Sequence, residues 1–447
     1  MRKVIFICFL AVPSLLGCGC ERLDDDIDRH GGGDPLFIPL DEVAMLLSEV
    51  NVGPDQIREV ADAVSASTDN GYDEEYTMQD LFRSPGAGVG DSSLPAGMRR
   101  EKAAYERPLK DLIREHLLSG TSSAALLGSK SGDGTTVSAD DYIDALESSD
   151  IQIYWPFSED WDGKTPPVIT FDPGDGSETN VGYKTIVDAQ GNRTVTEVIV
   201  DEKMASEQPV WVINRNDDAL YTSLEMLRKQ DPDWGTGGGS IIVRPKPSLV
   251  SSAAYGRLPS GLSGLESEAC SSTSVRTLIL KDFTMLRNYD PWFAGASEFF
   301  VKMGSVEDFT ASTEAELKLY SPAITDFMIV VKRKYVGEPR PFNAVLVSDW
   351  TDQLDQCALM ITEDDGGTRT SWKCSAVVKI ASKSYGFEIS LPFNTKDDIV
   401  WRGQLSRRYL EVNDDLTGHF GDVDLTFQIA ESRQVLSSRT SRSRNAV

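Results

Sequence analysis

The hydrophobic pattern of the chain changes near residue 150, and this change limits the folds that are open to it. Before that point, apolar residues recur at intervals of three and four, which is the period of one helix face. The first such stripe consists of Val43, Leu46, Leu47 and Val50. All eight tryptophans come later in the chain. We therefore expect a helical region over residues 36–150 and another architecture beyond it.

Three further helices follow from the same kind of signal. Pro54 suits the first turn of a helix, and an apolar stripe follows it. The later stripes begin at Leu109 and at Tyr142. Ser138 with Asp141 resembles a capping box, in which each side chain bonds to the backbone N–H of the other residue. The last helix should therefore start directly after Ser138.

Short runs of β-branched and aromatic residues replace the stripes after residue 150. In residues 151–250 the expected strands are 151–157, 168–171, 181–187, 194–200 and 210–213. In residues 275–431 they are 275–280, 298–303, 327–332, 344–347, 358–362, 376–381, 386–391 and 425–429. The predicted fold class is α+β: a helical region, a middle region of mostly antiparallel strands, and a C-terminal β-sandwich.

The net charge and the composition of the chain exclude some classes of function. Asp and Glu number 70 against 44 Lys and Arg, which gives a net charge of −26. Phosphates would be repelled, so a nucleic-acid partner is not expected. The hydrophobic share of 40% argues against a disordered chain. With only three His, the chain has little room for histidine-based catalysis or metal sites. Residues 432–447 are rich in Arg and Ser, which predicts a disordered basic tail.

The N-terminus carries the features of an export signal. Arg2 and Lys3 precede an apolar run, Val4–Leu16, which is too short to cross a bilayer as a permanent helix. The run ends in Leu15-Leu16-Gly17-Cys18. This sequence resembles the lipobox of bacterial lipoproteins. The resemblance implies that residues 1–17 are removed and that Cys18 carries acyl chains, which attach the protein stably to a membrane.

Residues 18–35 are expected to be an acidic, glycine-containing tether. Gly19 follows the cysteine instead of the Asp that is typical of inner-membrane lipoproteins, which favours the outer membrane. Acidic residues follow at Glu21 and Asp24-Asp25-Asp26. They resemble the surface-export signal of some Gram-negative groups. A simply solvated tether explains them equally well, so periplasmic and surface-exposed locations both stay open.

Two cysteines permit a geometric prediction. A two-residue hairpin turn at Asp365-Gly366 would place Cys357 directly opposite Cys374. The pair would belong to the non-hydrogen-bonded class, with Cα atoms ~4.5 Å apart. A disulfide can bridge that distance, and an exported protein meets an oxidising compartment. We therefore expect a Cys357–Cys374 disulfide, with two buried thiols as the alternative.

Acidic residues gather in the expected turns of the C-terminal region. Asn288-Tyr289-Asp290 follows a strand, and Glu298 opens the next one. This spacing resembles the start of a C2 domain. The resemblance implies that Asp290 and Glu298 are ligands of Ca²⁺, an ion that takes six to eight oxygens. The candidate ligands from later loops are Asp364, Asp365, Asp397 and Asp398. The departures from the family are Glu298-Phe299 in place of Asp-Pro and the lack of an Asp-x-Asp motif.

A second resemblance covers about residues 151–217. Its segments are Ile151-Gln152-Ile153-Tyr154-Trp155-Pro156-Phe157, Pro167-Val168-Ile169-Thr170-Phe171, Asp188-Ala189-Gln190-Gly191-Asn192 and Pro209-Val210-Trp211-Val212-Ile213. They are similar to a family of uncharacterised secreted bacterial proteins, which brings no known activity.

Three functions stay open. The first is a binding or envelope-associated lipoprotein that is stabilised by Ca²⁺ and has a glycan or protein partner. The second is a secreted hydrolase that acts on glycan or peptide, with Trp155, Trp161 or Trp292 as sugar platforms. The third is a structural or assembly lipoprotein. The chain contains no HExxH, CxxC or GxSxG motif, so no catalytic residues are assigned.

Overall fold

The computed structural model describes residues 36–83, 100, 103–120, 122–124, 129, 136–188, 190, 193–217, 221–230 and 274–433. The described residues, from Leu36 onward, form one compact unit. The predicted signal and lipid site at Cys18, the tether 18–35 and the tail from residue 434 lie outside the described residues. No helix of the described part is long and apolar enough to cross a membrane.

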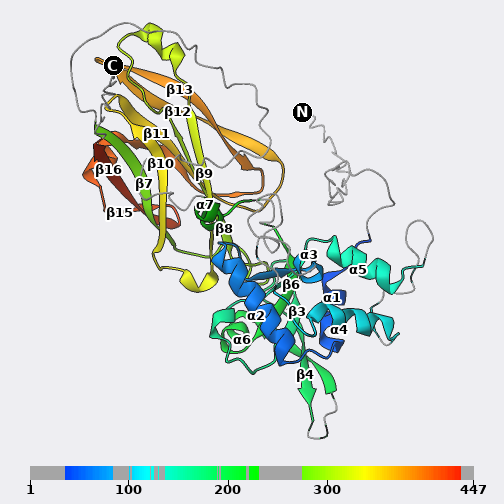
Figure 1. The fold of residues 1–447 in the computed structure, drawn as a ribbon. Helices are drawn as coiled ribbons and strands as arrows, with labels where there is room; N and C mark the ends of the chain where they lie inside the picture. The colour runs from blue at the N-terminus through cyan, green and yellow to red at the C-terminus, as the bar shows by residue number, and fades with distance from the viewer. Residues whose placement is uncertain are drawn as a thin grey trace, which may run out of the picture. The chain divides into compact units, whose positions relative to one another are not determined.

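The first half of the compact unit, residues 36–230, combines helices with one sheet and is called the α/β part below (Figure 1). Its helices are α1 (Leu40–Glu49), α2 (Pro54–Asp69), α3 (Met78–Phe82), α4 (Leu109–Leu118), α5 (Ala139–Glu147), α6 (Glu202–Glu207) and α7 (Leu224–Gln230). Its strands are β1 (Glu75–Thr77), β2 (Ile151–Tyr154), β3 (Val168–Phe171), β4 (Thr179–Val187), β5 (Arg193–Asp201) and β6 (Val210–Arg215).

The six strands form a sheet in the order β1-β2-β6-β3-β4-β5. All neighbours are antiparallel except β3 and β6. The expected strands 181–187 and 194–200 are present as β4 and β5, which pair with each other, and the predicted capping box at Ser138 is confirmed. Strand β1 lies within the region expected to be helical, because its three residues pair with the edge of β2.

Alternation along the strands divides the sheet into two apolar faces. Ile153, Trp211 and Ile213 face the helices and share one buried core with Val43 and Leu47. The helical region and the middle strands therefore build a single core. Residues of opposite parity face the other way, namely Tyr154, Val168, Val210 and Val212. That second face receives Trp292 and Phe293 from the C-terminal half.

The C-terminal half, residues 274–433, consists of two β-sheets and is called the sandwich part below. Its strands are β7 (Ser274–Met285), β8 (Ser297–Ser305), β9 (Ala323–Val331), β10 (Arg340–Trp350), β11 (Leu354–Glu363), β12 (Arg369–Ile380), β13 (Lys383–Asn394), β14 (Asp398–Ser406), β15 (Thr417–Phe420) and β16 (Val423–Arg433), with the short helix α8 (Arg407–Val412).

One of these sheets has the order β10-β7-β16-β15, and the other has β13-β12-β11-β8-β9 with β14 paired to β11. Apolar side chains of both sheets meet in one core. At its centre the rings of Phe283 on β7 and Phe299 on β8 lie 5.1 Å apart. The expected α+β mix with mostly antiparallel sheets is therefore confirmed.

The predicted pairing of Cys357 with Cys374 is wrong. Both are free thiols, Cys357 buried and Cys374 half-buried. Strand β11 pairs with β12 only at Leu354 and Gln356, and from Gln356 onward it pairs with β14. Cys357 therefore faces Leu405, while Cys374 faces Ile389 on β13. The hairpin prediction failed because β14 had not been expected.

Candidate carboxylate centre

Three carboxylates from separate segments meet at one end of the sandwich part. Asp290 lies on the connection between β7 and β8, Glu298 is near the start of β8, and Glu363 ends β11. One oxygen of each lies within 4.8 Å of the others. We call these three residues the carboxylate centre.

Strand register explains why they meet. Strands β8 and β11 are antiparallel, with Glu363 opposite Phe299, so the start of one strand lies beside the end of the other. The backbone N–H of Asp364 donates to the carbonyl oxygen of Glu298 at 3.0 Å and extends this pairing by one step. The connection that precedes β8 then carries Asp290 over the same end.

The deep burial of Glu298 and Glu363 distinguishes this centre from ordinary surface acids. Glu363 is 0% exposed and Glu298 is 3% exposed. Within the described residues, no amide, hydroxyl, ammonium or guanidinium group donates to Oδ2 of Asp290 or to either oxygen of Glu363. Buried polar atoms are nearly always satisfied in native proteins, so each such group requires an explanation.

Electrostatics at the centre favours a positive charge. Burial, and after it the nearby Asp290 carboxylate, raises the pKa of Glu363 well above its ordinary value. Burial also raises the pKa of Asp290. Like-charged carboxyls that share a dry site resist joint ionisation. A bound cation removes this conflict, because it supplies the charge that the protein lacks there.

A pocket of about 420 Å³ opens beside Asp290. It is lined by Asp217, Tyr221, Asp290, Asp364, Asp365, Gly366, Gly367 and Asn394. Burial and the surrounding acids raise the pKa of Asp365 to about 6. Gly366 and Gly367 both have positive φ, at 70° and 97°, which only glycine adopts readily. The tight turn that they form holds Asp364 and Asp365 at the pocket.

The last two predicted acids lie at the same end of the sandwich part. Asp397 is buried and accepts a hydrogen bond from the backbone N–H of Asn394 at 2.7 Å. The amide of Asn394 also donates to Asp364 at 2.9 Å. Asp398 begins β14, opposite Glu363, and is exposed. All six predicted acids thus gather at one end, but only Asp290 and Glu298 belong to the three-residue centre.

Sequence reasoning missed Glu363. It directly precedes Asp364-Asp365, so the run of three acids was visible. It was overlooked because the expected strand ended at residue 362 and the turn was considered separately. The contribution of Asp217 from the α/β part had no sequence signal, because a contact over such a separation comes only from the tertiary fold.

The centre contains only oxygen donors, and this limits its chemistry. Hard cations such as Ca²⁺ and Mg²⁺ prefer carboxylate and carbonyl oxygens. Asp290, Glu298 and Glu363 would be the inner ligands, with Asp364 and Asp365 within the same pocket wall. The two buried oxygens of Glu363, which accept no hydrogen bond from an amide, hydroxyl, ammonium or guanidinium group of the described residues, match such a cation. The residues therefore fit the ion that the C2 resemblance implies.

Other candidate residues have structural partners. His116 pairs with Glu49 at 2.9 Å, and His419 pairs with Asp424 at 2.8 Å. Trp155 and Trp292 are 1% and 0% exposed, so neither presents a face on which a sugar could stack. Trp161 is half-buried, and its indole N–H donates to the carbonyl oxygen of Thr165 at 2.9 Å.

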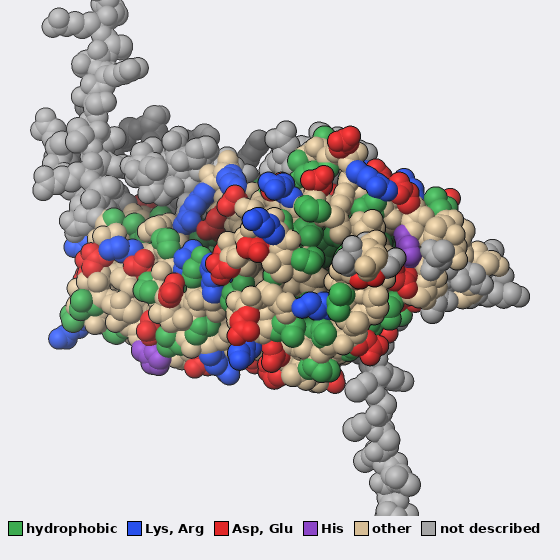
Figure 2. Space-filling model, turned by 90° about the horizontal axis from the view of Figure 1, so that it is seen from below, with side chains coloured by type: hydrophobic (Ala, Val, Ile, Leu, Met, Phe, Trp, Pro, Cys, Tyr) green, Lys and Arg blue, Asp and Glu red, His purple; other side chains and the backbone are tan. Residues whose placement is uncertain are grey.

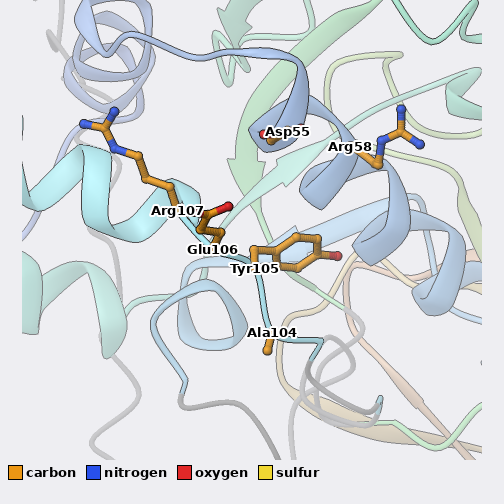
Figure 3. Close-up of a pocket in the computed structure, with 6 residues that line it drawn as sticks. All are labelled: Asp55, Arg58, Ala104, Tyr105, Glu106 and Arg107. Carbon is orange, nitrogen blue, oxygen red and sulfur yellow. The ribbon is translucent and has the colours of Figure 1, made fainter.

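A larger hollow of about 570 Å³ lies elsewhere, beside the start of α2 (Figure 3). It is lined by Asp55, Arg58, Ala104, Tyr105, Glu106 and Arg107. Figure 3 shows the guanidinium groups of Arg58 and Arg107 on opposite sides, pointing away from Tyr105. The charges of this hollow do not converge on a common point.

Acidic and basic side chains are interspersed over the face of the molecule seen in Figure 2. That face therefore lacks a concentrated field of one sign. The grouping of acids at the end of the sandwich part is a local feature and does not simply repeat the overall charge.

No family model, curated protein or solved structure matches this chain.

Proposed function

We propose that this chain is a lipid-anchored binding protein of the bacterial outer membrane, whose sandwich part takes up Ca²⁺ at Asp290, Glu298 and Glu363. The observation that carries the calcium proposal is Glu363, a fully buried carboxyl group that accepts no hydrogen bond from an amide, hydroxyl, ammonium or guanidinium group of the described residues. A buried acid of this kind costs stability unless a partner arrives. A hard cation is the partner that the three converging carboxylates fit.

Calcium is preferred over magnesium because of how the ligands are held. Mg²⁺ demands near-ideal octahedral geometry, whereas Ca²⁺ accepts six to eight oxygens in irregular arrangements. Glu298 and Glu363 are fixed on strands, but Asp290 lies on a connection and Asp365 on a glycine turn. A ligand set that combines strand residues with residues of connections suits Ca²⁺, which accepts irregular coordination geometry.

A C2-like identity of the sandwich part belongs to the same proposal. In its support, acids from three connections lie at one end, namely those between β7 and β8, β11 and β12, and β13 and β14. Glu363, which the resemblance did not include, is the departure that matters most for the ligand set.

Calcium-dependent thermal unfolding tests the metal proposal. We expect the melting temperature of the full chain to rise when millimolar calcium replaces a chelator. Glu363→Gln should abolish that rise, because an amide keeps the shape of the side chain but supplies a weaker ligand. The matched control is Glu307→Gln, an acid just beyond the far end of β8 that accepts a hydrogen bond from Ser348 at 2.8 Å. It should keep the full response. Equal melting temperatures with chelator and calcium would remove the proposal.

The anchor is tested separately, by metabolic labelling with a radioactive fatty acid. The wild-type chain should be labelled and should fractionate with outer membranes. Cys18→Ala should be unlabelled and should leave the membrane fraction. Labelling that persists in the variant would contradict the assignment of Cys18.

A further inference from the structure

The connection between β7 and β8, residues 286–296, joins the two halves of the compact unit. Trp292 and Phe293 at its centre are both 0% exposed and pack on the second face of the α/β sheet, against Tyr154, Val168 and Val212. Through these two aromatic side chains, the β7–β8 connection of the sandwich part covers an apolar face of the α/β sheet.

Polar contacts hold the same segment on the α/β part. The indole N–H of Trp292 donates to the carbonyl oxygen of Glu178 at 3.0 Å. The amide of Asn214 donates to the carbonyl oxygen of Phe293 at 3.2 Å. The backbone N–H of Ala296 donates to Asp73 at 3.1 Å. Gly295 has φ of 151°, and a Cβ there would lie 2.8 Å from the Asp73 carboxylate, so a larger residue would be strained and would displace that side chain.

Asp290 ties this segment to the carboxylate centre. It lies two residues before Trp292, and its side chain meets Glu298 and Glu363 at the strand ends of the sandwich part. Its carbonyl oxygen accepts a hydrogen bond from Arg333 at 2.9 Å, and Arg333 pairs with Glu202 of α6 at 2.8 Å. Asp290 thus belongs to the carboxylate centre through its side chain and is linked to the α/β part through Arg333.

We infer that cation binding at the carboxylate centre and docking of the β7–β8 connection on the α/β part are thermodynamically linked. This inference rests on the proposed function. Without a cation, the centre contains no positive charge that would draw Asp290 toward Glu298 and Glu363, so the connection is held less firmly over the strand ends. A cation that ligates Asp290 together with Glu298 and Glu363 holds the connection over the strand ends, where Trp292 and Phe293 reach their site. Linkage is reciprocal, so the docked aromatic pair must raise the affinity for the cation by the same factor.

Hydrogen exchange of the full wild-type chain is the primary test, with calcium or a chelator as the only difference. We expect backbone amides of residues 292–296, and those of β3 and β6 beneath them, to exchange at least roughly tenfold more slowly with calcium. The turn end of the β12–β13 hairpin, residues 378–385, serves as the internal reference and should be unchanged, because it lies at the opposite end of these strands from Asn394 at the pocket. Protection that stops at Asp290, Glu298 and Glu363 would overturn the inference.

Isothermal titration of two variants supplies the reciprocal test. Trp292→Leu should weaken calcium binding by about tenfold, within the usual range of coupling between sites. The control is Trp350→Leu, a tryptophan of the sandwich part that is 4% exposed and donates to the carbonyl oxygen of Leu354. It should leave the affinity unchanged. Equal affinities of Trp292→Leu and wild type would contradict the linkage, and if the variant does not fold, hydrogen exchange of the wild type decides. A wild type that binds no calcium would instead refute the proposed function.

Discussion

The α/β part and the sandwich part both bury carboxyl groups, but they satisfy them differently. In the α/β part, Asp80 is 0% exposed and lies between Arg83 and Arg100. Glu59 is 1% exposed and accepts hydrogen bonds from the Tyr76 hydroxyl at 2.8 Å and the Leu109 N–H at 2.6 Å. Glu363 in the sandwich part is as deeply buried and receives no such donor from the described residues.

The comparison separates two uses of a buried acid. A carboxylate with its own cations and donors stabilises the fold, and its loss leaves those partners unsatisfied. A carboxyl group that lies among other acids contributes little to the stability of the protein without a ligand. Its partner is a cation that binds from solution. Substitutions should therefore affect folding in the first region and ligand response in the second.

The largest effect is expected for Asp80→Ala. Arg100 is 5% exposed, so the substitution leaves a buried guanidinium without its carboxylate. The free energy of unfolding should fall by about 3–5 kcal/mol, as is typical when one partner of a buried ion pair is removed. Urea titration measures this loss. The comparison would fail if Asp80→Ala and Glu363→Gln cost equal stability in chelator.

Asp73 and Glu74, the two acidic residues directly before β1, should make the free energy of unfolding depend on pH. Burial raises the pKa of Glu74 to about 7 from an ordinary value of 4.5, although Lys332 lies 3.4 Å away. The unfolded chain therefore loses this proton first. The contribution of Glu74 to stability should be fully present below pH 4.5 and should fall by on the order of 3 kcal/mol as the pH rises to 7.

Urea titrations at several pH values test this expectation. Burial raises the pKa of Asp73 as well, which adds a slope of the same sign. Glu74→Gln should remove the part of the fall that comes from Glu74, while Glu363 and Asp365, whose pKa values are also raised, keep a remaining slope of the same sign. An unchanged slope in this variant would show that other groups control the dependence.

The stabilisation by calcium should depend more on the buried acids of the carboxylate centre than on the exposed acids beside it. At a calcium concentration of 100 times the dissociation constant, the cation stabilises the wild type by roughly 2.7 kcal/mol. Glu363→Gln should lose this increment. Asp365→Asn should lose only part of it, since Asp365 is exposed at the pocket mouth. The measurement is urea unfolding with calcium and with chelator. A greater loss for Asp365→Asn would place the cation at the mouth instead of the buried centre.

The smallest effect concerns the start of α5. The Ser138 hydroxyl accepts a hydrogen bond from the Asp141 N–H at 3.2 Å, and Asp141 accepts one from the Ser138 N–H at 2.9 Å. Ser138→Ala should cost about 1 kcal/mol in urea titration. Ser148→Ala at the other end of the helix should cost less than about 0.5 kcal/mol. A larger loss at Ser148 would contradict the importance of the N-terminal cap.

Local patterns predicted much of this fold. The stripe from Val43 to Val50, the capping box at Ser138 and the alternating runs of the middle region each identify an element that the structure contains. These signals succeed because they depend on neighbours within a few residues. Strand β14 carries fewer apolar residues and escaped notice, and without it the partner of Cys357 was assigned wrongly.

The carboxylate centre also shows that local sequence patterns do not reveal contacts between distant segments. The resemblance to a C2 domain implied that Asp290 and Glu298 lie together, and the structure brings their oxygens close. Glu363 emerged only from the register of β8 against β11, which pairs segments some sixty residues apart. Its burial depends on the whole sandwich part, and no local pattern contains that information.

Calcium titration of the full wild-type chain, followed by calorimetry, tests the central claim most directly. The account predicts saturable binding to the carboxylate centre, and it predicts that Glu363→Gln loses this binding while Glu307→Gln keeps it. Absence of binding at millimolar free calcium, or equal binding by wild type and Glu363→Gln, would contradict the account.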